Sequence, residues 1–144
     1  MNNGPYNLQR FVDAQSQVFD SVLDELGAGR KRSHWIWFVF PQLSGLGTSA
    51  MADRYGISSR AEASAYLEHD ILGPRLRECA RLVQHVDGRS IEDIFGWPDY
   101  LKVRSCMTLF ARSTVDNDDF VAVLDKFYNG EEDPVTIERL SEMS

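Results

Sequence analysis

Apolar residues recur every three or four positions along most of the chain, which is the spacing of one face of an α-helix. The first such stretch, Leu8 to Leu26, predicts a helix that Gly27 ends. Later stretches predict helices over 50–54, 59–67, 70–88, 90–96, 98–112 and 116–130, and a last helix that begins at 133. The expected fold is therefore all-α, one compact multihelical domain over residues 1–144.

The most apolar stretch runs from His34 to Gln42 and reads His-Trp-Ile-Trp-Phe-Val-Phe-Pro-Gln. A buried aromatic side chain removes about 150–250 Å² from water, so the other elements are expected to pack around this stretch. Residue propensities favour a strand here. However, no other run of alternating or β-branched residues could pair with it, and an isolated strand has nothing to pair with. We therefore predict a short buried helix at the centre of the fold, ended by Pro41.

Charge and composition narrow the classes of partner. The chain has 144 residues and a net charge of −7, which argues against nucleic acid or an anionic membrane as the partner. No apolar run approaches the roughly 20 residues of a transmembrane helix, and residues 1–5 lack the features of a signal peptide, so a cytoplasmic location is expected. Cys79 and Cys106 are expected to be reduced and buried, and no cysteine spacing indicates a metal site.

Two groups of polar residues flank the central stretch. In the basic triplet 30–32, Lys31 could hold an anion, and the nearby His34 could act as a general acid or base. The alternative is a solvated run of charge beside a histidine that hydrogen-bonds a loop. The turn from Gly45 to Ser49 could bind phosphate through backbone N–H groups at a helix start. Because it lacks the lysine of a nucleotide P-loop, a plain structural turn is the alternative there.

A third polar group lies on the helix that Pro98 opens. Asp99, Lys102 and Ser105 follow one another at three-residue spacing, so they are expected to share one helix face and to line a polar cleft. Asp99 could also pair with Lys102, an interaction worth about 0.2–0.5 kcal/mol on an exposed helix. His69 precedes a helix start, and although a structural role is favoured for it, it is the best functional candidate among the remaining histidines.

These residues resemble a family of uncharacterised bacterial and fungal domains that is often mislabelled calpastatin. The family signature is Lys-x-x-His-Trp-x-Trp-Phe-x-Phe-Pro-Gln, which this chain matches at Lys31, His34, Trp35, Trp37, Phe38, Phe40, Pro41 and Gln42. Further polar matches are Ser49, Tyr55, His69, Asp99, Lys102 and Ser105. The resemblance covers almost the whole chain and implies an all-helical domain with a short helix buried at its centre. It brings no established activity.

Two details qualify the resemblance. Calpain inhibitors act through repeated, largely disordered segments that fold on binding, whereas this chain has no repeats and a full set of core residues, so we reject the calpastatin label. Cys106 stands where relatives usually carry a second serine, which leaves Ser105 as the hydroxyl to test.

Two functions remain open from the sequence. The first is a small-molecule site that binds or processes a phosphate-containing, nucleotide-type or NAD-derived ligand in a polar cleft. Its expected residues are His34, Asp99 and Ser105 for catalysis and Lys31, Trp37, Gln42, Ser49, Tyr55, His69 and Lys102 for ligand contacts. The second is a non-enzymatic module that accepts a partner protein in an exposed helix groove. A concave polar pocket would favour the first, and a large exposed apolar patch would favour the second. The sequence identifies neither a substrate nor a cofactor.

Overall fold

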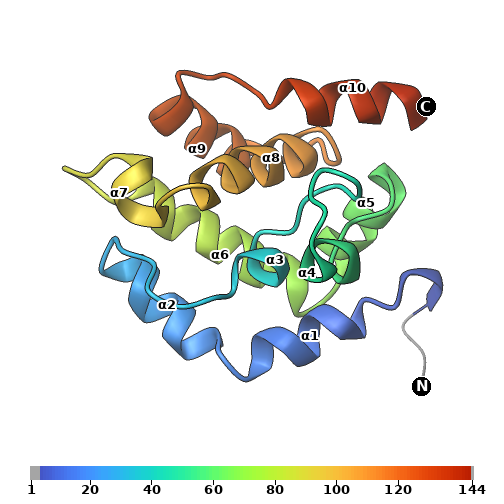
Figure 1. Ribbon diagram of the computed structural model, residues 1–144, viewed down its shortest axis with the longest axis horizontal. Coiled ribbons are helices and arrows are strands. Elements are labelled where there is room, and N and C mark those ends of the chain that lie inside the picture. Colours follow the sequence, from blue (N-terminus) through green and yellow to red (C-terminus); the bar gives the residue numbers. More distant parts are fainter. Residues whose placement is uncertain (1–3, 144) are drawn as a thin grey trace.

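Short helices account for nearly all of the regular structure (Figure 1). The computed structural model describes residues 4–143. The helices are η1 (Gly4–Tyr6), α1 (Gln9–Ser16), α2 (Phe19–Gly27), α3 (Ile36–Val39), α4 (Ala50–Arg54), α5 (Arg60–Glu68), α6 (Leu72–Gln84), α7 (Ile91–Phe95), α8 (Asp99–Ala111), α9 (Asp118–Tyr128) and α10 (Pro134–Met143). Within the described residues there is no strand, and the β-pairing is a single parallel bridge between Leu43 and Ile57. The all-α prediction is confirmed; the ends of the 1–144 domain prediction, residues 1–3 and 144, lie outside this range.

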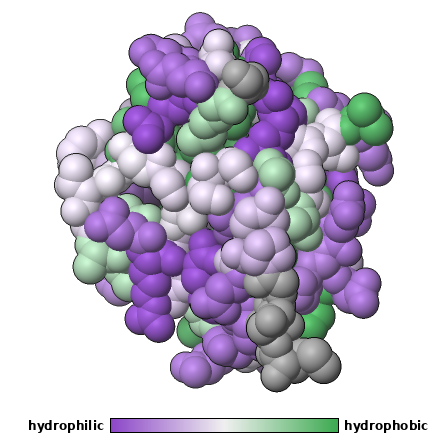
Figure 2. Space-filling view, turned by 90° about the vertical axis from the view of Figure 1, so that its right-hand side faces the viewer, coloured by the Kyte–Doolittle hydropathy of each residue, from purple (hydrophilic) through white to green (hydrophobic). Residues whose placement is uncertain are grey.

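Helices α8 and α6 are the two elements that pack most extensively against the others. Helix α8 contacts α5, α7, α9 and α10, while α6 packs against α2, α5 and α9. In Figure 1, α10 runs above α8, whereas α1 and α2 lie along the opposite side of the molecule. Because neighbours surround it, every residue from Ser105 to Ala111 of α8 is buried. The face shown in Figure 2, which carries the end of α10, is mainly hydrophilic, and its apolar residues form small separate patches.

The central stretch forms the predicted short buried helix. Helix α3 has four residues, and its turn is closed by hydrogen bonds from Val39 N to Trp35 O and from Phe40 N to Ile36 O. Trp35, Phe38 and Phe40 are buried, and their rings pack against other aromatic residues, among them Phe95 and Tyr55. A largely buried segment needs its backbone groups paired internally, and one helical turn achieves this where no partner strand exists.

The prediction of one helix from Leu8 to Leu26 is wrong, because the chain bends between α1 and α2. Gln15 is buried near the end of α1, where its Nε2 donates to Phe38 O at 2.7 Å and contacts the Tyr66 hydroxyl oxygen at 3.0 Å. This anchors α1 to α3, whereas α2 packs on α6. A straight helix could not follow both neighbours, so packing overrides a continuous apolar period.

Helix starts followed the sequence signals in part. Ser49, Ser59 and Ser90 cap α4, α5 and α7 with their side chains, and Ser90 forms a full capping box with Asp93. The helices predicted to begin at 70 and 116 start later: α6 starts at Leu72, where His69 Nδ1 accepts from the backbone N–H groups of Ile71 and Leu72, and α9 begins after Asn117. The two cysteines are free and buried, as predicted, and burial raises the pKa of the Cys79 thiol to about 12.

Candidate functional site

A carboxylate held between two lysines marks the start of α8. The chain contains three lysines, and two of them contact Asp99. Lys31 Nζ lies 2.8 Å from Asp99 Oδ2, and Lys102 Nζ lies 3.3 Å from Asp99 Oδ1. Lys31 reaches α8 because its backbone N–H donates to Ile94 O at 2.7 Å, which fixes the loop after α2 against α7. Packing thus joins a loop residue to a distant helix start.

The two lysines differ in exposure. The Lys31 side chain is 7% exposed and lies 5.2 Å from the Trp35 ring centre, whereas the Lys102 side chain is 25% exposed. Two positive charges on one carboxylate leave the cluster with a net charge of +1 in a protein of net charge −7. Because Lys31 is closer to Asp99 and more buried, the remaining positive charge is available mainly at Lys102.

Lys102 opens into a cleft of about 260 Å³. The cleft lies between the turn after α3, one face of α8 and the start of α10. Its polar wall contains Gln42, Lys102, Ser105 and Asp133, and its apolar wall contains Leu46, Pro98, Leu101 and Val135. The sequence prediction that Lys102 and Ser105 line one cleft therefore agrees with the geometry. Lys31 and Asp99 do not line it; Lys31 instead faces a separate hollow beside Arg30 and Arg89.

Ser105 and Asp133 link α8 to α10 at the floor of this cleft. Ser105 Oγ donates to Asp133 Oδ2 at 2.9 Å, and the same carboxylate oxygen accepts from the backbone N and the hydroxyl of Thr136. The Asp133 backbone N–H donates to Thr108 Oγ1 at 2.9 Å. The carboxylate that faces Ser105 is thus already occupied by three donors. This arrangement fixes α10 as one wall of the cleft.

The remaining predicted site residues lie elsewhere. His34 is exposed and makes no side-chain hydrogen bond or ion pair within residues 4–143. Ser49 accepts from Ala52 N, and His69 Nδ1 accepts from Ile71 N and Leu72 N, so both side chains cap helices. Tyr55 packs among aromatic rings of the core. The structure therefore brings His34, Ser49 and His69 to none of these groups, whereas Tyr55 meets Gln42 and Lys102 only at a small hollow beside Trp37.

Trp37 lies beside the cluster but is partly covered. Lys102 Nζ sits 5.0 Å from the Trp37 ring centre, a cation–π distance. Trp37 and Tyr55 also border a hollow of about 10 Å³, which is at the lower limit for a single water molecule. Trp37 therefore helps to position Lys102 and has little free space for a stacked ring.

Sequence reasoning missed Leu101, Asp133 and Val135 as cleft residues. Asp133 matches the family pattern and, with Pro134, carries a helix-start signal, but neither observation indicates a cleft. Apolar residues on a helix are expected to face a core, so Leu101 and Val135 gave no indication of a site. Within residues 4–143, no three His, Cys, Asp or Glu side chains are grouped as a metal site requires, and no helix is both long and apolar enough to span a bilayer.

Glu25 organises the loop that carries Lys31. Its carboxylate accepts from the backbone N–H groups of Arg32 and Ser33, from Ser33 Oγ and from Trp35 Nε1. Burial acts to raise the pKa of Glu25, but the hydrogen bonds from Ser33, Arg32 and Trp35 together outweigh it and lower the pKa below its ordinary value. The ionised carboxylate is therefore the form that holds this loop in place.

Replacing Glu25 with Gln is expected to lower the free energy of unfolding at pH 7. A folded-state pKa below the unfolded value gives stability that is present above the unfolded pKa and is lost as the pH falls through the folded pKa. The difference between wild type and Glu25→Gln should therefore shrink as the pH falls from about 5 toward 3. Urea denaturation at several pH values measures this, and a constant difference over that range would contradict it. Glu68→Gln, at an exposed glutamate on α5, is the control and should show little effect.

Comparison with known proteins places the chain within a group of relatives. A family described as "Protein of unknown function (DUF1810)" matches residues 5–140. A solved structure, the crystal structure of the conserved hypothetical protein Rv1873 from Mycobacterium tuberculosis, matches with 64% sequence identity and a TM-score of 0.94. The match covers 95% of this chain and 98% of that one. No curated protein matches.

Proposed function

The chain belongs to the DUF1810 family, whose function is unknown, and we propose that the cleft beside α8 in this chain binds a small phosphate-containing ligand of the nucleotide or NAD-derived type. The observation that carries the proposal is the Lys31–Asp99–Lys102 cluster, which presents a positive group to a polar cleft on an acidic protein. In this proposal the protein binds a small ligand in the cytoplasm, and its partner is neither a nucleic acid nor a membrane surface.

Each residue of the cluster has a distinct role in the proposal. Lys102 contacts the anionic group directly, because it alone of the cluster lines the cleft. Asp99 orients Lys102 without neutralising it, because Lys31 shares the carboxylate. Gln42 and Ser105 provide uncharged polar atoms on the same wall. Ser105 is positioned by Asp133, so it serves to orient the ligand; a chemical step by Ser105 would need a free base, and the Asp133 oxygen beside it is occupied.

The proposal predicts opposite effects of two substitutions. Lys102→Met should weaken binding of AMP or ADP-ribose by about 10- to 100-fold, which corresponds to loss of one charged hydrogen bond. Asp99→Asn should instead tighten binding by about three- to tenfold, because it removes a negative charge next to Lys102. Isothermal titration calorimetry at fixed ionic strength measures both, after a thermal-shift comparison of AMP, ADP-ribose and inorganic phosphate.

Lys126→Met is the matched control. Lys126 Nζ donates to Gln84 O, Val86 O and Asp87, away from the cleft, so its replacement should lower stability and leave the affinity unchanged. If none of the three anions stabilises the wild type more than an equal ionic strength of sodium chloride, the proposed function is wrong. Equal losses for Lys102→Met and Lys126→Met would also contradict it.

The alternative function is a protein-binding module. Leu101 and Val135 are exposed apolar residues that line the same cleft, and the exposed Trp97 directly precedes the cleft residue Pro98; this observation favours it. In that case, anions should have no effect on stability, and substitutions of these apolar residues should impair association with a partner.

A further inference from the structure

An exposed tryptophan lies next to the cleft. Trp97 is 78% exposed, which is uncommon for a side chain that has the largest apolar surface of the twenty residues. It lies in the turn before α8 and directly precedes Pro98, and both Pro98 and Leu101 line the cleft. Hydrogen bonds from Tyr100 N to Gly96 O and from Leu101 N to Pro98 O close the turn that leads into α8. The backbone of Trp97 is therefore held at the edge of the cleft, because its neighbour Pro98 belongs to the apolar wall.

The fold does not use the Trp97 ring. The ring of Trp35 is buried, and the ring of Trp37 has Lys102 over it. In the part of the chain that the structure describes, Trp97 has no ring–ring or cation–π contact and no side-chain hydrogen bond. Of the three tryptophans, Trp97 is thus the one whose ring remains open to a ligand.

The small volume of the cleft indicates that part of a bound ligand would lie outside it, beside Trp97. Pockets that enclose drug-sized ligands have volumes of about 300–1,000 Å³, and the cleft at about 260 Å³ lies below that range. An organic phosphate that places its anionic group at Lys102 would therefore extend beyond the cleft. Its path runs along Pro98 and Leu101, which are apolar and suit a flat ring better than a second charged group.

We propose that Trp97 is the platform for the ring of an organic phosphate, a nucleoside monophosphate being the simplest example, whose anionic group contacts Lys102. This inference rests on the proposed function and assigns the two parts of the ligand to different residues. Lys102 recognises the charge, and Trp97 with Leu101 recognises the ring by stacking and apolar contact. Trp37, which the sequence suggested as a ligand contact, is assigned to positioning Lys102.

The test compares two ligands that share an anion but differ in a ring. AMP carries the adenine base and ribose 5-phosphate does not. Wild type should bind AMP about tenfold or more tightly than ribose 5-phosphate, because the base stacks on the aromatic ring. Trp97→Ala should remove this preference and leave ribose 5-phosphate binding unchanged, whereas Trp97→Phe should retain part of it. AMP should also quench the tryptophan fluorescence of the wild type, and this change should be lost in Trp97→Ala.

Val115→Ala is the matched control, since Val115 is a fully exposed apolar residue in the loop before α9. It should keep the wild-type preference for AMP. Absence of binding for both ligands would overturn the proposed function itself. Binding of both ligands with the same ratio in wild type and Trp97→Ala would overturn the role of Trp97 and leave the anion site intact. A wild-type dimer seen by light scattering, with a monomer in Trp97→Ala, would assign the rim to a second copy of the chain and overturn the inference.

Discussion

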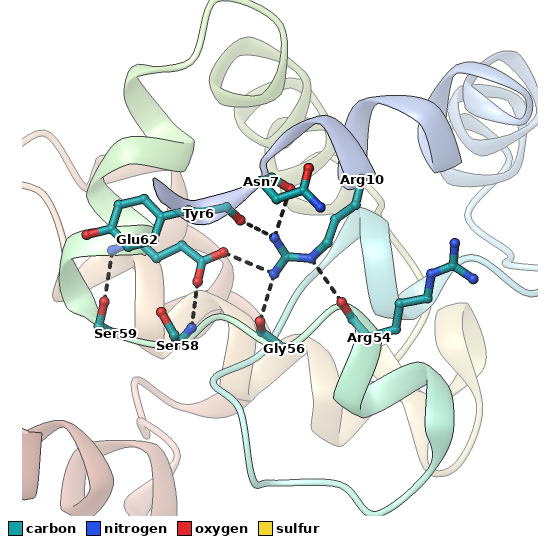
Figure 3. A network of polar contacts seen from close by, with 8 residues as sticks. All are labelled: Tyr6, Asn7, Arg10, Arg54, Gly56, Ser58, Ser59 and Glu62. Atoms are coloured by element: carbon teal, nitrogen blue, oxygen red, sulfur yellow. Dashed lines mark hydrogen bonds and ion pairs between the residues drawn. The ribbon is translucent and has the colours of Figure 1, made fainter. Parts of the chain in front are cut away.

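Replacement of Arg10 with Met is expected to lower the free energy of unfolding by about 3–5 kcal/mol, the range for loss of one partner from a buried ion pair. The Arg10 guanidinium donates to the carbonyl oxygens of Tyr6, Asn7, Arg54 and Gly56 and to Glu62 Oε2, the last at 3.0 Å (Figure 3). The Glu62 side chain is only 3% exposed, so it would lose its cation in a site with little access to water.

The hydrogen bonds of Arg10 are connected to the cleft through the segment after α4. Gly56, whose carbonyl oxygen Arg10 holds, precedes Ile57, and Ile57 N donates to Gln42 O at 2.8 Å. Gln42 lies on the polar wall of the cleft. Loss of Arg10 should therefore also weaken binding of an anionic ligand, although Arg10 itself does not line the cleft.

Two further variants isolate the cause. Arg54→Met is the matched control, because only the backbone oxygen of Arg54 takes part in the network and its side chain points away from it (Figure 3). The double variant Arg10→Met with Glu62→Met should be less destabilised than the sum of the single variants, because it leaves no unpaired charge. Urea denaturation measures the wild type, the single variants Arg10→Met, Glu62→Met and Arg54→Met, and the double variant. A loss below about 1 kcal/mol for Arg10→Met, as for an exposed pair, would contradict the expectation.

Replacement of Gly73 with Ala is expected to destabilise the protein by about 3 kcal/mol or more, the upper range for overpacking. A Cβ atom at Gly73 would lie 2.0 Å from Leu67 O and 2.9 Å from Leu67 C. Both are backbone atoms of α5, so no side-chain rotation can relieve the overlap, and α5 would have to move away from α6. The close approach of these two helices therefore depends on glycine at this position.

Gly27→Ala is the control for this substitution. Gly27 is the last residue of α2, and a Cβ atom there would meet nothing within 4 Å. Alanine in a helix is favoured over glycine by up to about 1 kcal/mol, so Gly27→Ala should leave the stability unchanged or raise it. Thermal unfolding followed by circular dichroism compares the two variants, and similar melting temperatures for them would contradict the steric argument.

The sequence alone determined the elements whose signals are local. Helical spacing of apolar residues, serine caps before α4, α5 and α7, and the absence of a pairing partner for the central stretch were enough to predict an all-α fold around a short buried helix. Part of the candidate site also followed, because Asp99, Lys102 and Ser105 occupy one face of a single helix. Such features depend on residues three or four positions apart, and these positions are visible in one sequence.

The tertiary structure decided everything that depends on distant contacts. The stretch predicted as one first helix forms two helices, because α1 packs against α3 and α2 packs against α6. Tertiary packing brought Lys31 to Asp99 through a backbone hydrogen bond to Ile94, and left His34 exposed although it is only three residues from Lys31. It also covered one tryptophan, Trp37, with Lys102 and left another, Trp97, open at the rim of the cleft. Trp37 and Trp97 are the same residue type, and Lys31 and His34 are close in sequence, yet the members of each pair differ in burial and contacts. They differ because burial and charge pairing depend on the neighbours that the assembled fold supplies.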